Sequence, residues 1–190
     1  MKTTCLYTSI SLLLFGFVFL TGLHSCKKTD KNRFSRKVGD HEVCVLLKQY
    51  SDSSFALKLL VDDSLNSTWK LDYPVYRFDF GDVDNDGVPE ILVGTIKPTR
   101  FDPKPDKRLF IFKITKDFYI RPMWLGSRVS QPLVDFRLKE DTAKSRIRTI
   151  EKEQDETFLV AEYGWRGFGL EFIRYICRNV SREKAQQEFF

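Results

Sequence analysis

Short stretches of this chain alternate apolar and polar residues, and turn-forming residues separate one stretch from the next. Residues 146–150, Arg-Ile-Arg-Thr-Ile, put polar and apolar side chains on opposite faces of an extended segment, whereas the denser apolar run 108–113 is typical of a more buried strand. We find no long amphipathic helix. The pattern predicts strands at 42–49, 55–61, 69–71, 75–80, 90–96, 108–115, 119–126, 133–138, 145–151, 157–163 and 170–178. Many short strands with regular turn signals predict an all-β antiparallel domain.

The N-terminal segment 1–25 has the pattern of a targeting sequence. Lys2 supplies a positive charge, and the apolar stretch 6–20 is too short for a stable membrane span. Residues 23–26, Leu-His-Ser-Cys, resemble the bacterial lipobox, in which the cysteine becomes the lipidated first residue of the mature protein. The resemblance implies an anchor at Cys26 in the bacterial cell envelope, outside the cytoplasm, with the outer membrane favoured over the inner. An ordinary signal peptide with a free cysteine is the alternative.

Polar segments flank the predicted body of the chain. Residues 26–37 are basic and poor in aromatics, which predicts a flexible tether. Residues 38–178 are enough for one domain, and 179–190 form a polar tail, either frayed or one short helix. The formal net charge is +5, with Lys and Arg spread singly along the strands. A nucleic-acid partner requires a clustered basic stripe and is therefore not expected.

Two cysteines remain in the body once Cys5 and Cys26 are assigned to the targeting segment and the anchor. Cys44 and Cys177 lie in the first and last predicted strands. A compartment outside the cytoplasm permits a disulfide between them. Sequence does not supply the Cα separation that a bridge requires, so a disulfide and two free thiols both stay open, with free thiols slightly favoured.

An acidic stretch at 82–90, Asp-Val-Asp-Asn-Asp-Gly-Val-Pro-Glu, is the most informative motif of the chain. Asp82, Asp84 and Asp86 alternate, and carboxylates this close repel one another unless a cation lies among them. A hard divalent ion that prefers oxygen ligands, Ca²⁺ above all, fits this pattern. A tight turn between strands also explains Asp-Asn-Asp-Gly, but it requires neither the third Asp nor the Glu. We therefore favour a cation site.

The remaining ligand positions follow from the spacing of calcium loops. Gly87 is the sixth residue from Asp82, where the chain turns sharply. Val88 would then offer its backbone carbonyl, and Glu90 a carboxylate oxygen, directly or through water. An EF-hand is excluded because its twelfth position would be Val93 and because the flanks read as strands.

The stretch 80–93, Phe-Gly-Asp-Val-Asp-Asn-Asp-Gly-Val-Pro-Glu-Ile-Leu-Val, resembles the FG-GAP or VCBS repeat. This repeat is the calcium-loop blade of integrin-type β-propellers, so the resemblance implies propeller-like blades and a role in binding or scaffolding. A weak internal repeat agrees, since 133–137 corresponds to 76–80, and Glu140 and Asp141 stand where the acidic loop would be. Only about three such units fit, and a closed propeller usually needs about four. The prediction is an open or incomplete propeller, with a twisted β-sandwich as the alternative.

A second notable stretch, 163–172, is rich in aromatic residues and glycines. Trp165 and Phe168, with Arg166 as a hydrogen-bonding partner, are candidates for binding a sugar or a peptide. The alternative is a corner between strands in which the aromatics are core residues, and we favour it because aromatics usually pack inside.

Signs of catalysis are few. His41 is the single histidine after the targeting segment, and the sequence has no nucleophile elbow, phosphate-binding glycine loop or zinc-ligand cluster. A glycosidase that uses two distant carboxylates leaves no sequence signature and stays open. We expect a non-enzymatic, lipid-anchored binding or scaffold module with one structural Ca²⁺. The alternative is a carbohydrate-binding or carbohydrate-active lipoprotein, and the partners are the membrane and a glycan or protein ligand.

Overall fold

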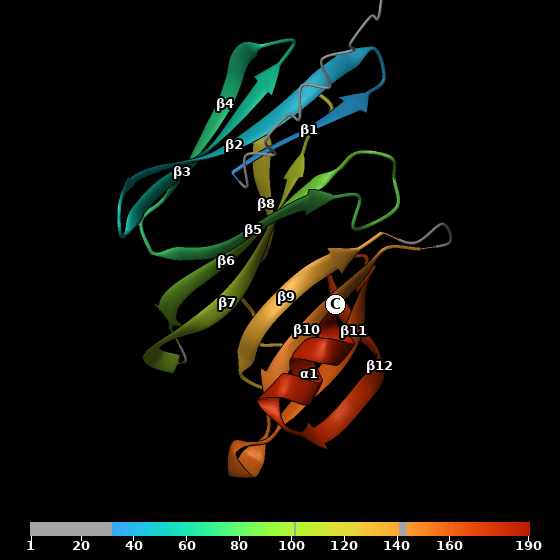
Figure 1. The fold of residues 1–190 in the computed structure, drawn as a ribbon. Helices are drawn as coiled ribbons and strands as arrows, with labels where there is room; N and C mark the ends of the chain where they lie inside the picture. The colour runs from blue at the N-terminus through green and yellow to red at the C-terminus, as the bar shows by residue number, and fades with distance from the viewer. Residues whose placement is uncertain (1–31, 101, 141–143) are drawn as a thin grey trace, which may run out of the picture.

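The chain forms three four-stranded antiparallel sheets followed by one α-helix (Figure 1). The computed structural model describes residues 32–100, 102–140 and 144–190. Sheet 1 consists of β1 (Arg33–Val38), β2 (His41–Ser51), β3 (Ser54–Val61) and β4 (Ser64–Leu71). Sheet 2 consists of β5 (Val75–Gly81), β6 (Glu90–Thr99), β7 (Asp102–Ile114) and β8 (Ile120–Leu125). Sheet 3 consists of β9 (Leu133–Lys139), β10 (Arg146–Lys152), β11 (Phe158–Arg166) and β12 (Gly169–Val180).

Each sheet is a meander, because strands adjacent in sequence are also adjacent in the sheet. A short 3₁₀ turn, η1 (Gln154–Glu156), precedes β11, and α1 (Arg182–Phe189) follows β12. Ser181 caps α1 by accepting a hydrogen bond at its hydroxyl from the Lys184 N–H, at 3.3 Å. The all-β prediction is thus confirmed, with strands at every position where the alternation predicted one.

The three sheets pack face to face, and sheet 2 lies in the middle. Its central strand β6 shows why: Ile91 and Val93 point into one core with sheet 1, whereas Leu92 points into a second core with sheet 3. A strand buried on both faces needs the near-continuous apolar run that this sequence has. The second core also holds Phe136 of β9, and both Phe136 and Leu92 are fully buried.

Helix α1 covers the other face of sheet 3, where Ala185 and Phe189 are buried against Ile150 and Val160 (Figure 1). The predicted C-terminal tail is therefore the short helix of the two alternatives. Its signal in the sequence is weak, since only two buried side chains, four positions apart, distinguish it from a solvated segment.

The first strands of the sheets contact one another, which positions the acidic loop. The Arg77 guanidinium of β5 pairs with the Asp135 carboxylate of β9. Asp79 of β5 accepts a hydrogen bond at its carboxylate from the Leu138 N–H of β9, at 2.9 Å. On the other side, the ring of Phe34 in β1 lies 5.2 Å from the ring of Phe78.

The prediction of a flexible tether over 26–37 was wrong from Arg33 onward, because 33–37 belong to β1. Strand β1 pairs with β2 along its whole length, from Arg33 opposite Leu46 to Val38 opposite His41. Phe34 and Val38 pack against the core between sheets 1 and 2, so alternate residues of this basic segment bury apolar area. Residues 1–31, with the targeting segment and Cys26, lie outside the described residues.

Cys44 and Cys177 are free thiols in the structure. Cys44 lies on β2 in sheet 1 and Cys177 on β12 in sheet 3. Burial raises the pKa of the Cys177 thiol, which makes it a poor nucleophile at neutral pH. Among the residues that the structure describes, no helix has the length and apolar character needed to cross a membrane.

Candidate metal centre

The acidic loop joins β5 to β6 at one end of sheet 2. Strand β5 ends at Gly81 and β6 begins at Glu90, and between them Val83 is buried in the core shared with sheet 3. With Val83 pointing inward, carboxylate oxygens of Asp82, Asp84 and Asp86 lie within 4.8 Å of one another. In the described part of the chain, this is the one group of three or more acidic, His or Cys side chains close enough to share a metal ion. The structure thus brings together the three alternating aspartates.

Backbone N–H groups of the loop point at these carboxylates. The Gly87 N–H donates to Asp82 Oδ2 at 2.9 Å, and the Val88 N–H donates to Asp86 Oδ1 at 2.8 Å. The turn requires positive φ at Asn85, 64°, and at Gly87, 88°. A Cβ at Gly87 would meet nothing within 4 Å, so glycine is needed there for its backbone conformation and not for space.

The other two predicted ligands, Val88 and Glu90, have no side-chain atom in this cluster. The Glu90 side chain does not belong to the group of three, and its Oε2 accepts a hydrogen bond from the Val83 N–H at 2.8 Å. Glu90 is 2% exposed, and burial next to the aspartates raises its pKa to about 8. Val88 is half-buried, and its predicted role belongs to its carbonyl. Direct ligation by Val88 and Glu90 therefore stays a prediction.

Glu140, the residue after β9, holds the acidic loop to sheet 3. Its Oε1 accepts a hydrogen bond from the Asp82 N–H at 2.9 Å, and its two oxygens pair with the Arg36 guanidinium of β1 at 2.8 and 2.6 Å. The hydrogen bond with Arg36 lowers the pKa of Glu140. On the other side, the Ser145 N–H donates to Asn85 Oδ1 at 3.0 Å. The sequence indicated where Glu140 lies relative to the repeat, but gave no sign of these supporting contacts.

The electrostatics of the loop favour a bound cation. Burial and the neighbouring Asp86 raise the pKa of Asp84, which shows that its carboxylate lies among like charges and is incompletely solvated. A divalent cation would reverse this repulsion. Carboxylate oxygens without thiolate or imidazole suit Ca²⁺ or Mg²⁺ better than a transition metal.

The aromatic stretch 163–172 forms the β11–β12 hairpin and does not assemble its three candidate residues into one site. Trp165 packs against the core between sheets 2 and 3, in agreement with a corner. Arg166 pairs with Glu171 at 2.7 Å on the surface. Phe168 stands at the tip of the hairpin and is 93% exposed.

Comparison with known proteins gives no relative for this fold or this loop: no protein-family model, curated protein or solved structure matches the chain.

Proposed function

We propose that this protein is a lipid-anchored, extracytoplasmic binding or scaffold module in which one Ca²⁺ fixes the β5–β6 loop. The observation that carries the proposal is the cluster of Asp82, Asp84 and Asp86, with their oxygens within 4.8 Å. The backbone around it is already turned as a calcium loop requires, with positive φ at Gly87. No catalytic role is assigned to the loop.

We further propose that the three sheets are the blades of an open propeller. Each sheet is a four-stranded meander, and the first strands β1, β5 and β9 contact one another through Phe34, Arg77 and Asp135. Propeller blades have this arrangement, with the first strand innermost. A twisted β-sandwich remains the alternative architecture.

The proposed role of the ion is structural. Extracellular calcium modules bind with dissociation constants of roughly 10⁻⁴–10⁻³ M, which suits a permanently filled site outside the cytoplasm. Because Asp82 is hydrogen-bonded through its N–H to Glu140 at 2.9 Å, ordering the loop also strengthens its contact with sheet 3. Calcium would therefore stabilise the contact between the β5–β6 loop and sheet 3.

Calorimetry of the purified protein with and without calcium tests the site. We expect Ca²⁺ to raise the melting temperature of the wild type and Asp84→Ala to abolish that increase. Asp117→Ala, which removes an exposed carboxylate in the β7–β8 turn, is the matched control and should keep the full increase. A wild-type melting temperature that does not change with calcium would refute the site.

The anchor has its own test. Cys26→Ser should move the protein from the membrane fraction to the soluble fraction of the cell envelope and abolish labelling with a fatty-acid analogue. Labelling that persists in the variant would exclude Cys26 as the acylated residue.

Glycan binding is the second candidate function, and the exposed aromatics of the last hairpin favour it. The rings of Phe172 and Tyr175 on β12 lie 4.6 Å apart, and 43% and 39% of these residues are exposed. With Phe168 they offer apolar ring faces to a sugar. Phe168→Ala and Phe172→Ala are the informative variants, because Trp165 packs against the core between sheets 2 and 3. Loss of binding to a glycan array with an unchanged melting temperature would support this function, and unchanged binding would exclude the aromatic stretch.

A further inference from the structure

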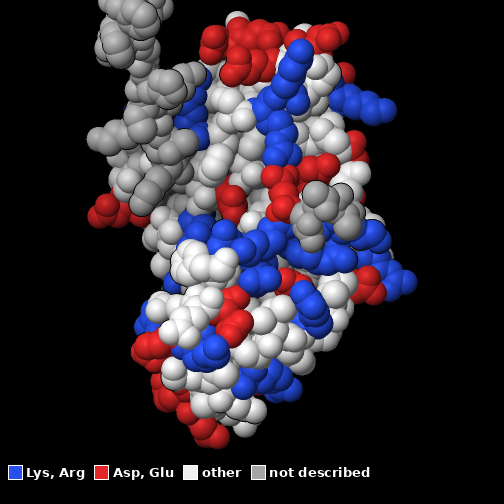
Figure 2. All heavy atoms as spheres, turned by 45° about the vertical axis from the view of Figure 1, so that its right-hand side comes forward, with Lys and Arg blue, Asp and Glu red and all other residues white. Residues whose placement is uncertain are grey.

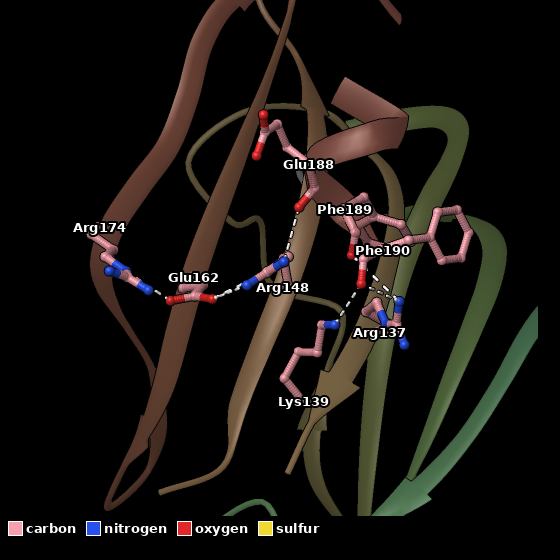
Figure 3. A network of polar contacts seen from close by, with 8 residues as sticks. All are labelled: Arg137, Lys139, Arg148, Glu162, Arg174, Glu188, Phe189 and Phe190. Atoms are coloured by element: carbon pink, nitrogen blue, oxygen red, sulfur yellow. Dashed lines mark hydrogen bonds and ion pairs between the residues drawn. The ribbon is translucent and has the colours of Figure 1, made fainter. Parts of the chain in front are cut away.

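One face of sheet 3 carries a row of charged residues from all four strands. Arg137 of β9 lies opposite Arg148 of β10, Arg148 opposite Glu162 of β11, and Glu162 opposite Arg174 of β12. Directly opposed like charges destabilise a sheet, so Arg137 beside Arg148 calls for compensation. Figure 3 shows how the row is balanced: the Glu162 carboxylate lies between Arg148, at 2.8 Å, and Arg174, at 2.9 Å.

Helix α1 supplies the rest of the compensation. Arg148 Nη1 donates to the carbonyl of Glu188 at 2.9 Å, and Arg137 Nη1 donates to the backbone oxygen of Phe190 at 3.4 Å (Figure 3). Cations favour the C-terminal end of a helix, where unpaired carbonyls and the helix dipole are negative. The first row of charges is therefore satisfied within the protein.

The next row of the same face is balanced only in part. Lys139 of β9 lies directly opposite Arg146 of β10, a second pair of like charges. Lys139 donates to the backbone oxygen of Phe190 at 2.8 Å, and Arg146 Nη1 donates to the carbonyl of Ser145 at 3.1 Å. Within the described residues, no side-chain carboxylate forms an ion pair with Lys139, Arg146 or the neighbouring Lys144.

These residues line a cleft of about 650 Å³ on this face. The strand position next to Arg146 is Gly164, where a Cβ would lie 3.3 Å from Arg146 Nη1, so the missing side chain leaves room beside the guanidinium. The lining has five basic and two acidic side chains, a formal excess of three positive charges. Both acids are already paired, Glu140 with Arg36 and Glu162 with two arginines. Figure 2 shows Lys and Arg gathered across the middle of one face of the molecule.

We propose that this cleft binds the phosphate group of an organic phosphate, with Lys144, Arg146 and Arg174 as its donors. Arg174 uses Nε for Glu162 and is 63% exposed, so its other nitrogens can reach a ligand. A dianion matches the excess charge better than a carboxylate does, and arginine forks bind phosphate oxygens in pairs. The cleft is larger than one phosphate, and Ile173, 40% exposed, gives its wall an apolar part for the rest of the molecule.

The phosphate can belong to a soluble ester or to a lipid headgroup, and titration separates the two. Glycerol phosphate is titrated into the purified protein by calorimetry in a zwitterionic detergent. In parallel, the Cys26→Ser variant, which lacks the proposed acyl anchor, is sedimented with phosphatidylcholine vesicles that contain or lack phosphatidic acid, whose phosphate is a monoester like that of glycerol phosphate. Binding of glycerol phosphate identifies a soluble ester as sufficient, and binding to the anionic vesicles alone identifies a lipid headgroup. Binding of neither probe overturns the proposal.

A charge-matched pair of variants tests the location. The double variant Lys144→Gln and Arg146→Gln should weaken binding by about 10-fold or more, since each charge-assisted hydrogen bond contributes at least that much. The control, Lys58→Gln and Lys70→Gln on sheet 1, removes the same charge elsewhere and should bind like the wild type. Equal losses in the two double variants would show that binding follows net charge alone and would refute the cleft. The site is independent of calcium and of the anchor, so Asp84→Ala and Cys26→Ser should retain it.

Discussion

The first hairpins of sheets 2 and 3 occupy the same place in their meanders but gather opposite charges. The β5–β6 hairpin brings three aspartates together, whereas the β9–β10 hairpin places Lys139 opposite Arg146. The two hairpins also touch, because Glu140 accepts a hydrogen bond from the Asp82 N–H. The backbone architecture thus repeats while the chemistry does not. Each hairpin leaves like charges that the protein balances only in part, and each is therefore suited to an ion of the opposite sign.

The largest loss of stability should come from weakening the core that joins the two hairpins. Phe136 of β9 is fully buried in the core between sheets 2 and 3, with its ring 6.3 Å from that of Tyr76 in β5. We expect Phe136→Ala to lower the free energy of unfolding by about 3–5 kcal/mol, measured by urea denaturation. Phe168→Ala, at an exposed tip, is the control and should change it by less than about 0.5 kcal/mol. Similar losses in both variants would mean that this core does not hold the sheets together.

Removing the charge of Glu162, which pairs with two arginines of sheet 3, should cause the next largest loss of stability. We expect Glu162→Gln to cost about 2 kcal/mol at pH 7, because Arg148 and Arg174 lose a charged acceptor. Glu156→Gln, which breaks an exposed pair with Lys152, should cost less than about 0.5 kcal/mol.

The stability lost in Glu162→Gln should depend on pH in a direction set by the pKa of Glu162. Burial raises the pKa of Glu162, but hydrogen bonds from Arg148 and Arg174 outweigh burial and keep the pKa below its usual value. The stabilisation is therefore fully present above the unfolded pKa of about 4.3 and is lost as pH falls through the lower folded value. The difference in unfolding free energy between wild type and Glu162→Gln should narrow on acidification to pH 3. A constant difference would show that the loss is not electrostatic.

Two glycines with positive φ allow the effect of backbone strain on stability to be distinguished from the effect on calcium binding. Gly87 of the acidic loop and Gly39 of the β1–β2 turn both have positive φ, 88° and 59°, with open space where a Cβ would stand. Either substitution by Ala should cost about 1 kcal/mol of calcium-free stability. Only Gly87→Ala should also reduce the increase in melting temperature with calcium. If Gly39→Ala reduces it equally, the calcium response does not arise from the β5–β6 loop.

The smallest effect on stability, but an informative one, concerns the contact between the hairpins. Glu140→Gln should cost about 0.5 kcal/mol without calcium, since its pair with Arg36 is partly exposed. Calcium affinity should fall by roughly 10-fold, as expected when a residue that orients a ligand loses its charge. Isothermal titration measures this, with Glu171→Gln, from the exposed pair with Arg166, as control. An unchanged affinity would show that sheet 3 does not support the loop.

Local patterns in the sequence predicted the strands and the aspartate cluster, because both depend on near neighbours. Alternation identifies a strand over a few residues, and the spacing of Asp82, Asp84 and Asp86 fixes their proximity. Strand β1 escaped detection because its basic composition concealed the alternation of Phe34 and Val38. Phe34 and Val38 face the core only because β1 pairs with β2 in this register, and strand register depends on contacts between segments that local sequence does not reveal.

Contacts between distant segments had no local signal. The basic cleft is lined by residues from all four strands of sheet 3, which meet only through strand pairing. Glu140 likewise reaches Arg36 across 104 positions of the chain. Trp165 and Phe168 show the same limit, since Trp165 packs against the core and Phe168 is exposed although only three positions separate them.

The meander order of the strands also bears on how the chain reaches this fold. Every strand pairing in the three sheets joins sequence neighbours, so each sheet closes only short loops as it forms. Closing a short loop costs little chain entropy, and proteins dominated by local contacts fold faster than β proteins with distant pairings. The slow step should then be docking of preformed sheets through their apolar faces and not the search for strand partners. A chain that emerges in order, from a ribosome or through a membrane, can complete each sheet before the next arrives.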